Sequence, residues 1–384
     1  MTTSITRPAV AAEAVVDLAR IAHNVETIAS ATDAAVMAVV KADAYGHGMA
    51  PVARTALRHG ATWLGVTSCA EALRLRAAGI TAPILSWLYP HDVDFTAAIA
   101  ADVDLSAASI DHLTHIARAA ADVGRHAMVH LKVDTGLSRG GALPADWPDL
   151  VALARRFERQ GMVQVRGVWS HLIKSGHPRH PLAARQRQEF DEAVAVARSA
   201  GLDPSLRHLA NSAAALDEPE SHYDLVRPGI GLYGVEPVAG KTFGMRPALT
   251  LRAKIALVKR VPAGTGVSYD HAYVTDRPST LALVPLGYAD GIPRSVSGRA
   301  RVSIGGELHP IVGVIAMDQF VVNLGDHAAQ AGDDVVLIGS GAGEPTVTDW
   351  ATWSNTIPHE ILTGIGARVP RRHVGEFVPL GGVQ

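Results

Sequence analysis

The sequence predicts a (β/α)₈ barrel of the TIM type, followed by a mostly-β C-terminal domain. Three observations support this. The first part of the chain alternates eight short apolar runs with helical segments. Near Gly244 the pattern changes to closely spaced strand-like runs. The length of 384 residues fits two domains, which we place at residues 1–244 and 245–384.

The first predicted barrel strand, residues 34–40, is a continuous apolar run that is too short for a helix and rich in Val. Such runs are typical of strands buried on both faces of a parallel sheet. The other strand candidates lie at residues 63–66, 83–87, 103–105, 127–133, 163–170, 206–209 and 225–226. Helical spacing first appears at Leu18, Ile21, Val25 and Ile28, and further helices are predicted at 49–59, 70–78, 110–123, 150–159 and 182–199. A doubly wound open sheet remains an alternative at this point.

The predicted second domain consists of strand-like runs punctuated by Gly, Pro and Asp. These runs cover residues 249–261, 280–286, 300–304, 310–315, 320–324 and 334–338. A helix is predicted at 349–362. An all-β domain with one late helix follows from this pattern.

The composition excludes several classes of function. The net charge of -2 comes from 35 basic and 37 acidic residues, so the chain has no surplus of positive charge for binding nucleic acid or an anionic membrane. The single cysteine, Cys69, excludes a disulfide framework and a cysteine-based zinc site. Met1–Val10 lacks the apolar core of a secretory signal, and no apolar run approaches the roughly 18 residues that span a bilayer. We therefore predict a cytoplasmic protein.

Polar side chains gather directly after several of the predicted strands. In a barrel, these positions share the C-terminal face, where reactive residues belong. Lys41 could form a Schiff base, and Arg227 could face a ring nitrogen. Ser212, predicted as the N-cap of the next helix, and the Gly229 region could cradle a phosphate. Pyridoxal 5′-phosphate is one ligand that would use all of these groups.

Several motifs, in order along the chain, resemble those of bacterial alanine racemases. Residues 39–48 (VVKADAYGHG) resemble the pyridoxal-lysine motif of that family. The resemblance continues at 131–136 with Arg139, and at 210–213, 227–234, 267–269, 287–291, 317–319 and 368–371. It implies a pyridoxal-phosphate barrel of fold type III, a β domain, and a head-to-tail homodimer that shares its active site between subunits.

The resemblance also implies roles for individual residues, which we state as expectations. Lys41 carries the cofactor, and Tyr45, Ser212, Gly229, Ile230 and His359 lie around its phosphate. Arg227 faces the pyridine nitrogen and His171 orients the site. Arg139 and the backbone N–H of Met317 bind the substrate carboxylate. Tyr269, Tyr288 and Met317 reach the partner subunit's site, and Lys132 carries a carbamate. No metal is expected.

The expected reaction is two-base racemisation, an isomerase activity that interconverts L- and D-alanine. Lys41 serves one face of the α-carbon and the partner subunit's Tyr269 serves the other. Lowering a tyrosine pKa from about 10 by three units takes about 4 kcal/mol, part of which Arg227 could supply through His171. An arginine at the ring nitrogen keeps that nitrogen unprotonated, which disfavours transamination. A D-alanine supply for peptidoglycan is the expectation for this family.

The sequence departs from the family pattern at three places, which leaves alternatives open. Residues 172–180 (LIKSGHPRH) replace a Cys-Ala-Asp-Glu-like stretch, and their histidines indicate either a solvated loop or a metal site. Ala316 replaces a cysteine. His359 stands where members have Tyr, either as a tolerated change or as part of a roomier pocket that accepts serine. A related basic amino-acid decarboxylase would need a cysteine in the second domain, and a pyridoxal-carrier protein would lack that domain.

Overall fold

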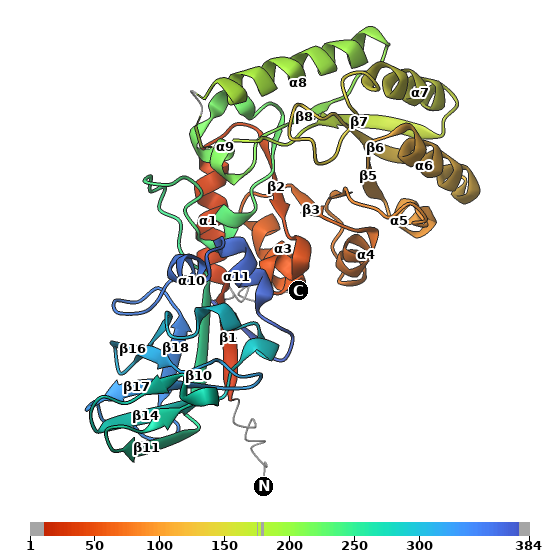
Figure 1. Cartoon of the computed structure of the whole chain (residues 1–384). Coiled ribbons are helices and arrows are strands. Elements are labelled where there is room, and N and C mark those ends of the chain that lie inside the picture. The colour runs from red at the N-terminus through yellow and green to blue at the C-terminus, as the bar shows by residue number, and fades with distance from the viewer. Residues whose placement is uncertain (1–10, 175, 178–179, 376–384) are drawn as a thin grey trace, which may run out of the picture. The chain divides into compact units, whose positions relative to one another are not determined.

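The computed structural model describes residues 11–174, 176–177 and 180–375, which form two compact units (Figure 1). Ala19–Arg246 is one unit, and the chain from Pro247 together with the strand before Leu18 is the other. Met1–Val10, where the sequence predicts no secretory signal, lies outside the described residues. Within the described ranges, no helix is both long enough and apolar enough to cross a lipid bilayer.

Eight parallel strands form the sheet of the first unit. They are β2 (Ala35–Val39), β3 (Trp63–Val66), β4 (Ile84–Ser86), β5 (Val103–Ala107), β6 (Ala127–Lys132), β7 (Val163–Trp169), β8 (Leu206–His208) and β9 (Leu225–Val226). Their spatial order is β8-β7-β6-β5-β4-β3-β2-β9. The gap between β8 and β9 is bridged by hydrogen bonds from Asp224 N to Arg207 O (3.0 Å) and from Arg227 N to Ala210 O (2.9 Å). The barrel prediction is confirmed, and the open-sheet alternative is wrong because the strand order never reverses.

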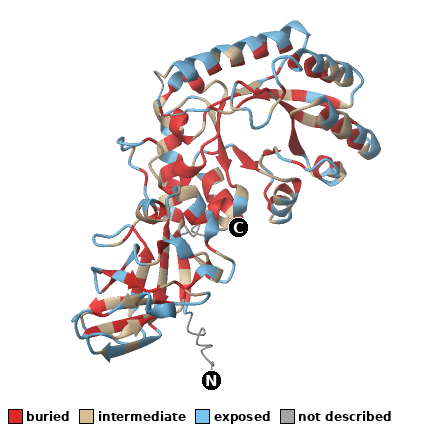
Figure 2. Ribbon diagram, viewed as in Figure 1, coloured by how far each residue is buried: buried red, intermediate tan, exposed pale blue. Residues whose placement is uncertain are grey.

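Helices follow most of the barrel strands and cover them from outside. They are α1 (Leu18–Ser30), α3 (Met49–Arg58), α4 (Cys69–Ala77), α5 (Thr96–Ala100), α6 (Ile110–Val123), α7 (Trp147–Arg159), α8 (Pro181–Ser199) and α9 (Ser212–Asp217). Local sequence sets several of their ends: Ser68 forms a capping box with Glu71, and Gly124 ends α6 in the left-handed conformation. The outer faces of α6, α7 and α8 are exposed, whereas the strands beneath them are almost wholly buried (Figure 2).

The second unit is built on a nine-stranded sheet. Its strands are β1 (Ala12–Asp17), β10 (Leu249–Lys254), β11 (Leu257–Val261), β14 (Ser279–Val284), β15 (Arg301–Ile304), β16 (Glu307–Val312), β17 (Phe320–Gly325), β18 (Asp334–Ile338) and β19 (Arg371–Val374), in the order β11-β14-β17-β16-β15-β18-β10-β1-β19. A two-stranded ribbon, β12 (Gly266–Val267) and β13 (Tyr273–Val274), accompanies it. The mostly-β second domain is confirmed.

Three details of the second unit differ from the prediction. The run 249–261 is two strands, β10 and β11. The helix expected at 349–362 is two helices, α10 (Val347–Ser354) and α11 (Pro358–Gly364), because Asn355 adopts a left-handed C-cap and Pro358 begins the next helix. The strand β1, placed with the barrel by the boundary at 1–244, pairs instead with β10 and β19, and Glu13 binds both Arg252 and Arg372.

Candidate active site

Lys41 begins a strained turn directly after the first barrel strand. The turn α2 (Lys41–Tyr45) has left-handed backbone angles at residues 42–45, with φ between 51° and 57°. Left-handed residues other than glycine cost roughly 1–2 kcal/mol each. Two carboxylates support the turn: Glu71 accepts a hydrogen bond from the Ala42 N–H (2.7 Å), and Asp43 accepts one from Met49 (2.9 Å). Such strain is typical of functional sites that the surrounding structure holds in place.

The environment of Lys41 makes its amine less basic than an ordinary lysine. Burial lowers the pKa of Lys41, the Arg139 charge lowers it further, and Glu71 opposes both. Its Nζ lies 5.9 Å from the centre of the Trp87 ring. A larger share of neutral amine at neutral pH makes Lys41 suited to nucleophilic attack and to proton transfer.

An anion cradle lies where β8 and β9 end. Ser212 Oγ accepts hydrogen bonds from the Gly229 N–H (2.8 Å) and the Gly231 N–H (3.2 Å). A Cβ added to Gly229 would stand 2.5 Å from Tyr45 Oη, so glycine is needed there. Burial raises the pKa of Tyr45 to about 12, which keeps its hydroxyl a hydrogen-bond donor. Ile230 begins the next turn and is buried.

Ser212 does not cap the following helix, which corrects the prediction from sequence. The N-cap is Asn211, whose side-chain oxygen accepts hydrogen bonds from Ala213 N (3.1 Å) and Ala214 N (3.2 Å). Ser212 is therefore released from the helix start, and its hydroxyl faces the glycine loop instead. Because Asn211 caps the helix, the Ser212 hydroxyl remains available for the phosphate binding expected of it.

Arg227 follows the last barrel strand and is 5% exposed. Its NH2 group donates hydrogen bonds to the carbonyls of Ser170 (2.7 Å) and Leu209 (3.2 Å). Its NH1 group lies 3.1 Å from His208 Nδ1. Burial lowers the pKa of Arg227 to about 9, which still leaves it charged at neutral pH. The described contacts hold this cation with carbonyls and an imidazole rather than with a carboxylate.

A buried chain of side chains continues from Arg227 into the barrel. His208 Nε2 lies 2.8 Å from His130 Nδ1, and His130 Nε2 lies 3.1 Å from Asp104 Oδ2. Asp104 also contacts Arg166 (3.0 Å). Arginine can only donate and a carboxylate can only accept, so each ring carries one proton, on Nε2. Burial and the Arg227 charge hold the pKa of His208 well below its usual value, in agreement with a neutral ring.

Sequence analysis did not identify Asp104, His130 or His208. All three lie in predicted strands, and each is at most 2% exposed. A charged residue inside an apolar strand run was the available signal, because buried carboxylates require partners. The sequence analysis linked only His171 to Arg227; the Arg227 charge does act on His171, and the structure adds His208 as a direct contact of Arg227.

His171 and Lys132 lie in the same field of positive charge. Burial, together with the charges of Arg227, Arg139, Lys132 and Lys41, lowers the pKa of His171 to about 3, so its ring is neutral at pH 7. Burial and the same two arginines lower the pKa of Lys132 to about 8. Its Nζ lies 4.4 Å from the centre of the Trp169 ring. These residues stand at the ends of parallel barrel strands, and their charges act on one another.

Arg139 is presented by a short turn after the strand β6. Asp134 Oδ1 accepts hydrogen bonds from Gly136 N (2.9 Å) and Ser138 N (3.1 Å), which orders that turn. Arg139 itself is exposed. An exposed guanidinium whose charge acts on both Lys41 and Lys132 is suited to binding a carboxylate from solution.

The remaining predicted site residues belong to the second unit. Tyr269, Tyr288 and Met317 are 70%, 44% and 53% exposed, which is unusual for large apolar side chains. Tyr288 N donates to Ala316 O (3.1 Å), and Ser268 Oγ accepts a hydrogen bond from Val314 N (3.1 Å). These bonds tie the Tyr269 and Tyr288 turns to the segment before Met317. His359 lies in α11 and is partly exposed.

The barrel residues fit a phosphorylated aldehyde cofactor. The Ser212 oxygen accepts from the Gly229 and Gly231 N–H groups, so its own proton is left to donate to an anion, and the absence of a side chain at Gly229 lets the loop lie against the Tyr45 hydroxyl. A lysine of lowered pKa and a buried arginine complete the set that pyridoxal phosphate needs.

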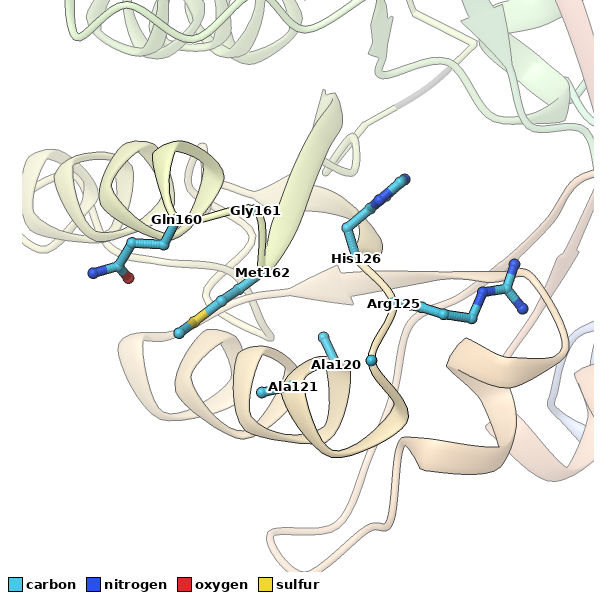
Figure 3. Close-up of a pocket in the computed structure, with 8 residues that line it drawn as sticks. Ala120, Ala121, Arg125, His126, Gln160, Gly161 and Met162 are labelled. Atoms are coloured by element: carbon cyan, nitrogen blue, oxygen red, sulfur yellow. The ribbon is translucent and has the colours of Figure 1, made fainter.

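A surface hollow at the opposite end of the barrel is separate from this site. Its volume is about 510 Å³, and it lies between the ends of α6 and α7 and the starts of β6 and β7 (Figure 3). Arg125, His126 and Met162 line it. The parallel strands carry Lys41, Lys132 and Arg227 at their other ends, so this hollow does not belong to the candidate active site.

The chain matches known families over nearly all of its length. Residues 16–237 match the alanine racemase N-terminal domain, and residues 248–373 match the alanine racemase C-terminal domain. An alanine racemase of Frankia casuarinae is 55% identical over 367 residues, which cover 94% of this chain and 96% of that protein. An alanine racemase of Streptomyces coelicolor is 48% identical over 376 residues, which cover 95% of this chain and 96% of that protein.

Solved structures give the same result. The crystal structure of alanine racemase from D-cycloserine-producing Streptomyces lavendulae has a TM-score of 0.94 at 48% identity, covering 97% of this chain and 99% of that one. The structure of alanine racemase from Bacillus anthracis with bound L-Ala-P has a TM-score of 0.89 at 34% identity, and the match covers 97% of this chain and 98% of that chain. The barrel, the second sheet and the ordered motifs agree with these matches, and the chain belongs to the alanine racemase family.

Proposed function

We propose that the chain interconverts L- and D-alanine with pyridoxal phosphate held at Lys41. The observation that carries this proposal is the convergence of Lys41, Arg227 and the Ser212–Gly229 cradle on one face of the barrel. When bound, pyridoxal phosphate supplies an electron-withdrawing ring that makes the α-carbon proton of the attached amino acid removable near neutral pH. Ser212, Gly229 and Ile230 hold the phosphate, and Tyr45 donates its hydroxyl to it.

Racemisation requires a base on each side of a planar carbon. Lys41 takes and returns the proton on the face of the D-enantiomer. Tyr269, contributed by a second copy of the chain, serves the other face. Its 70% exposure in the single chain supports this role, because a partner is needed to cover the ring. The protein therefore works as a homodimer with a shared site, to which Tyr288 and Met317 also contribute.

The substrate carboxylate is bound by Arg139 and by the backbone N–H of Met317. Arg139 already lies close enough to lower the pKa values of Lys41 and Lys132. His359 adjoins the phosphate in this proposal and limits the room for the substrate side chain. The free, buried thiol of Cys69 supports a location in the reducing cytoplasm.

Two experiments test the proposed function. Borohydride reduction of the cofactor-loaded protein, followed by peptide mass spectrometry, is expected to place the pyridoxyl group on Lys41. The purified, cofactor-loaded protein is expected to remove the optical rotation of L-alanine. The same assay with L-serine, carried out on the wild type and on His359→Tyr, measures the preference for alanine over serine. A label elsewhere on an active preparation, or a loaded protein that racemises no alanine, contradicts the proposal.

We expect Lys132 to carry a carbamate formed with carbon dioxide. A pKa of about 8 leaves about one amine in ten neutral at pH 7, against about one in three thousand for an ordinary lysine. Only the neutral amine attacks carbon dioxide, so occupancy should rise with bicarbonate and as the pH goes from 7 to 9. The negative product would be stabilised by Arg139 and Arg227, whose charges both disfavour the ammonium form. Carbon-13 NMR after incubation with labelled bicarbonate measures it.

The variant Lys132→Met provides the assignment of that signal. We expect it to lose the carbamate resonance and to raise the KM for alanine about tenfold, because Arg139 loses its anionic neighbour. Lys241→Met is the matched control, since Lys241 is half-exposed and paired with Asp217. An unchanged carbon-13 spectrum in Lys132→Met would rule out this site of modification.

We expect Arg227→Glu to slow racemisation and to raise the side reaction that releases pyruvate. A carboxylate at this position would hold a proton on the ring nitrogen, whereas arginine donates its own hydrogen bond and keeps that nitrogen unprotonated. A protonated ring favours transamination. The ratio of pyruvate formed to alanine racemised, measured with a coupled dehydrogenase, should rise at least about tenfold.

Arg227→Lys keeps the positive charge and is the control for that substitution. We expect it to lose activity without a comparable change in the ratio of pyruvate formed to alanine racemised. A lysine side chain, like arginine, cannot accept a hydrogen bond from a protonated ring nitrogen and so does not stabilise that proton. Equal partitioning in the wild type, Arg227→Glu and Arg227→Lys would show that residue 227 does not control the fate of the reaction.

A further inference from the structure

Three side chains with metal-binding chemistry lie together in the second unit, on residues outside the proposed catalytic set. Glu307 and His309 share one face of the strand β16, two residues apart. The antiparallel pairing of Ile311 with Val322 brings the start of β16 beside the end of β17, and His327 follows β17 by two residues. One ligand atom from each of the three side chains lies within 4.8 Å of the other two.

His309 is the buried member of this cluster. It is 6% exposed, and among the described residues its Nε2 atom has no hydrogen-bond partner. The Nε2 atom is therefore the atom of this ring that is available to a ligand. A histidine that binds a metal through one nitrogen almost always donates its other N–H to a carbonyl or carboxylate, and the backbone of Ile304 lies beside this ring.

His327 and Glu307 complete the arrangement. The His327 Nδ1 atom lies 3.5 Å from Glu307 Oε2, and the rings of His309 and His327 have their centres 4.9 Å apart. The turn of the β15–β16 hairpin makes room for this: a Cβ on Gly305 would stand 2.9 Å from His327 Nε2. A buried nitrogen without a hydrogen-bond partner requires an explanation, and a ligand bound beside the two imidazoles would supply the missing partner.

We propose that Glu307, His309 and His327 bind a divalent transition-metal ion, with Zn²⁺ as the preferred ion, which ties the β15–β16 hairpin to the end of β17. Two imidazole nitrogens and one carboxylate oxygen are zinc ligands, whereas Mg²⁺ and Ca²⁺ prefer oxygen alone. Three protein ligands leave a fourth position for water.

The observed spacing allows this ion after a small adjustment. Tetrahedral zinc with bonds near 2.0–2.1 Å holds its ligand atoms about 3.3 Å apart. The Glu307 side chain is 68% exposed and can rotate toward the histidines, whose rings are already adjacent. The alternative is an ion-free pair of histidines with a surface carboxylate, and a metal titration separates the two.

Metal binding to the intact, cofactor-loaded protein tests the proposal after removal of ions with a chelator. Titration with Co²⁺ is expected to give visible d–d absorption that saturates at one ion per chain. A hundredfold excess of Zn²⁺ over its Kd is expected to raise a thermal unfolding midpoint by about 5 °C. Glu307→Gln, His309→Gln and His327→Asn should each weaken Co²⁺ binding by at least about tenfold.

His126→Asn is the matched control, since His126 is exposed and belongs to the first unit. It should bind Co²⁺ as the wild type does. If His309→Gln does not fold, the other two variants decide the question, because Glu307 and His327 are more exposed. No spectrum at one equivalent of Co²⁺, or a spectrum that survives Glu307→Gln and His327→Asn unchanged, would overturn the proposal.

Discussion

Tyr269→Phe is expected to abolish racemisation while leaving the proton transfer by Lys41 in place. Removing one acid–base group costs roughly 10²- to 10⁴-fold in rate. Lys41 is unaffected, so D-alanine incubated in heavy water should still exchange its α-proton for deuterium without inversion of its configuration. L-alanine should neither exchange nor racemise. Proton NMR of the α-position, read for each enantiomer separately, measures both effects.

The asymmetry distinguishes a base from a merely structural tyrosine. Tyr273→Phe is the matched control, because Tyr273 lies in the same unit and its hydroxyl accepts a hydrogen bond from Asn323 (2.8 Å). It should retain nearly full activity. If Tyr269→Phe loses exchange of both enantiomers equally, or exchanges L-alanine as the wild type does, Tyr269 is not the base for the L-enantiomer.

Asp104→Ala is expected to destabilise the barrel by about 3 kcal/mol, because it leaves buried polar groups without partners. The Asp104 side chain is 3% exposed and accepts from both His130 and Arg166. Without it, the buried His130 N–H has lost its acceptor, and the proton positions of both histidines are no longer determined. Urea unfolding measures the stability, and we expect Asp104→Asn to lose about half as much.

A second measurement separates this chain's positioning role from simple stability. His208 depends on His130 to present a lone pair to Arg227, so Asp104→Ala should also weaken cofactor binding, measured as the Kd for pyridoxal phosphate. Glu189→Ala is the control: Glu189 pairs with Arg185 on the surface of α8, and its loss should cost less than about 1 kcal/mol. If Asp104→Ala and Glu189→Ala lower stability equally, the buried chain is not a structural element of the barrel.

Local pattern was enough to predict most of the barrel. Runs such as 34–40 and 63–66 are apolar and too short for helices, so each could be assigned without knowledge of its neighbours. The strand Ala12–Asp17 was missed although Ala12, Ala14 and Val16 alternate with less buried residues. Its partners lie more than two hundred residues away in β10 and β19, and proximity in sequence favoured the barrel.

Residue types after strands were enough to indicate the chemistry. Lys41, Arg227 and Ser212 each follow a strand, and the barrel geometry brings strand ends to one face. The left-handed turn at residues 42–45 could not be predicted, because Ala, Asp and Tyr rarely adopt that conformation. It depends on support from Glu71 and from the Asp43–Met49 bond.

By itself, the sequence determined the barrel, the β-rich second domain and the family, since apolar periodicity and ordered motifs are local properties. Only the tertiary structure decided which histidine contacts Arg227, which residue caps α9, and where Glu307, His309 and His327 meet. The contact with Arg227 is part of a chain of side chains far apart in sequence; His130 and His208, for example, are 78 residues apart. Their contacts depend on strand register and on which groups burial leaves in need of a partner, and neither can be read from a single segment.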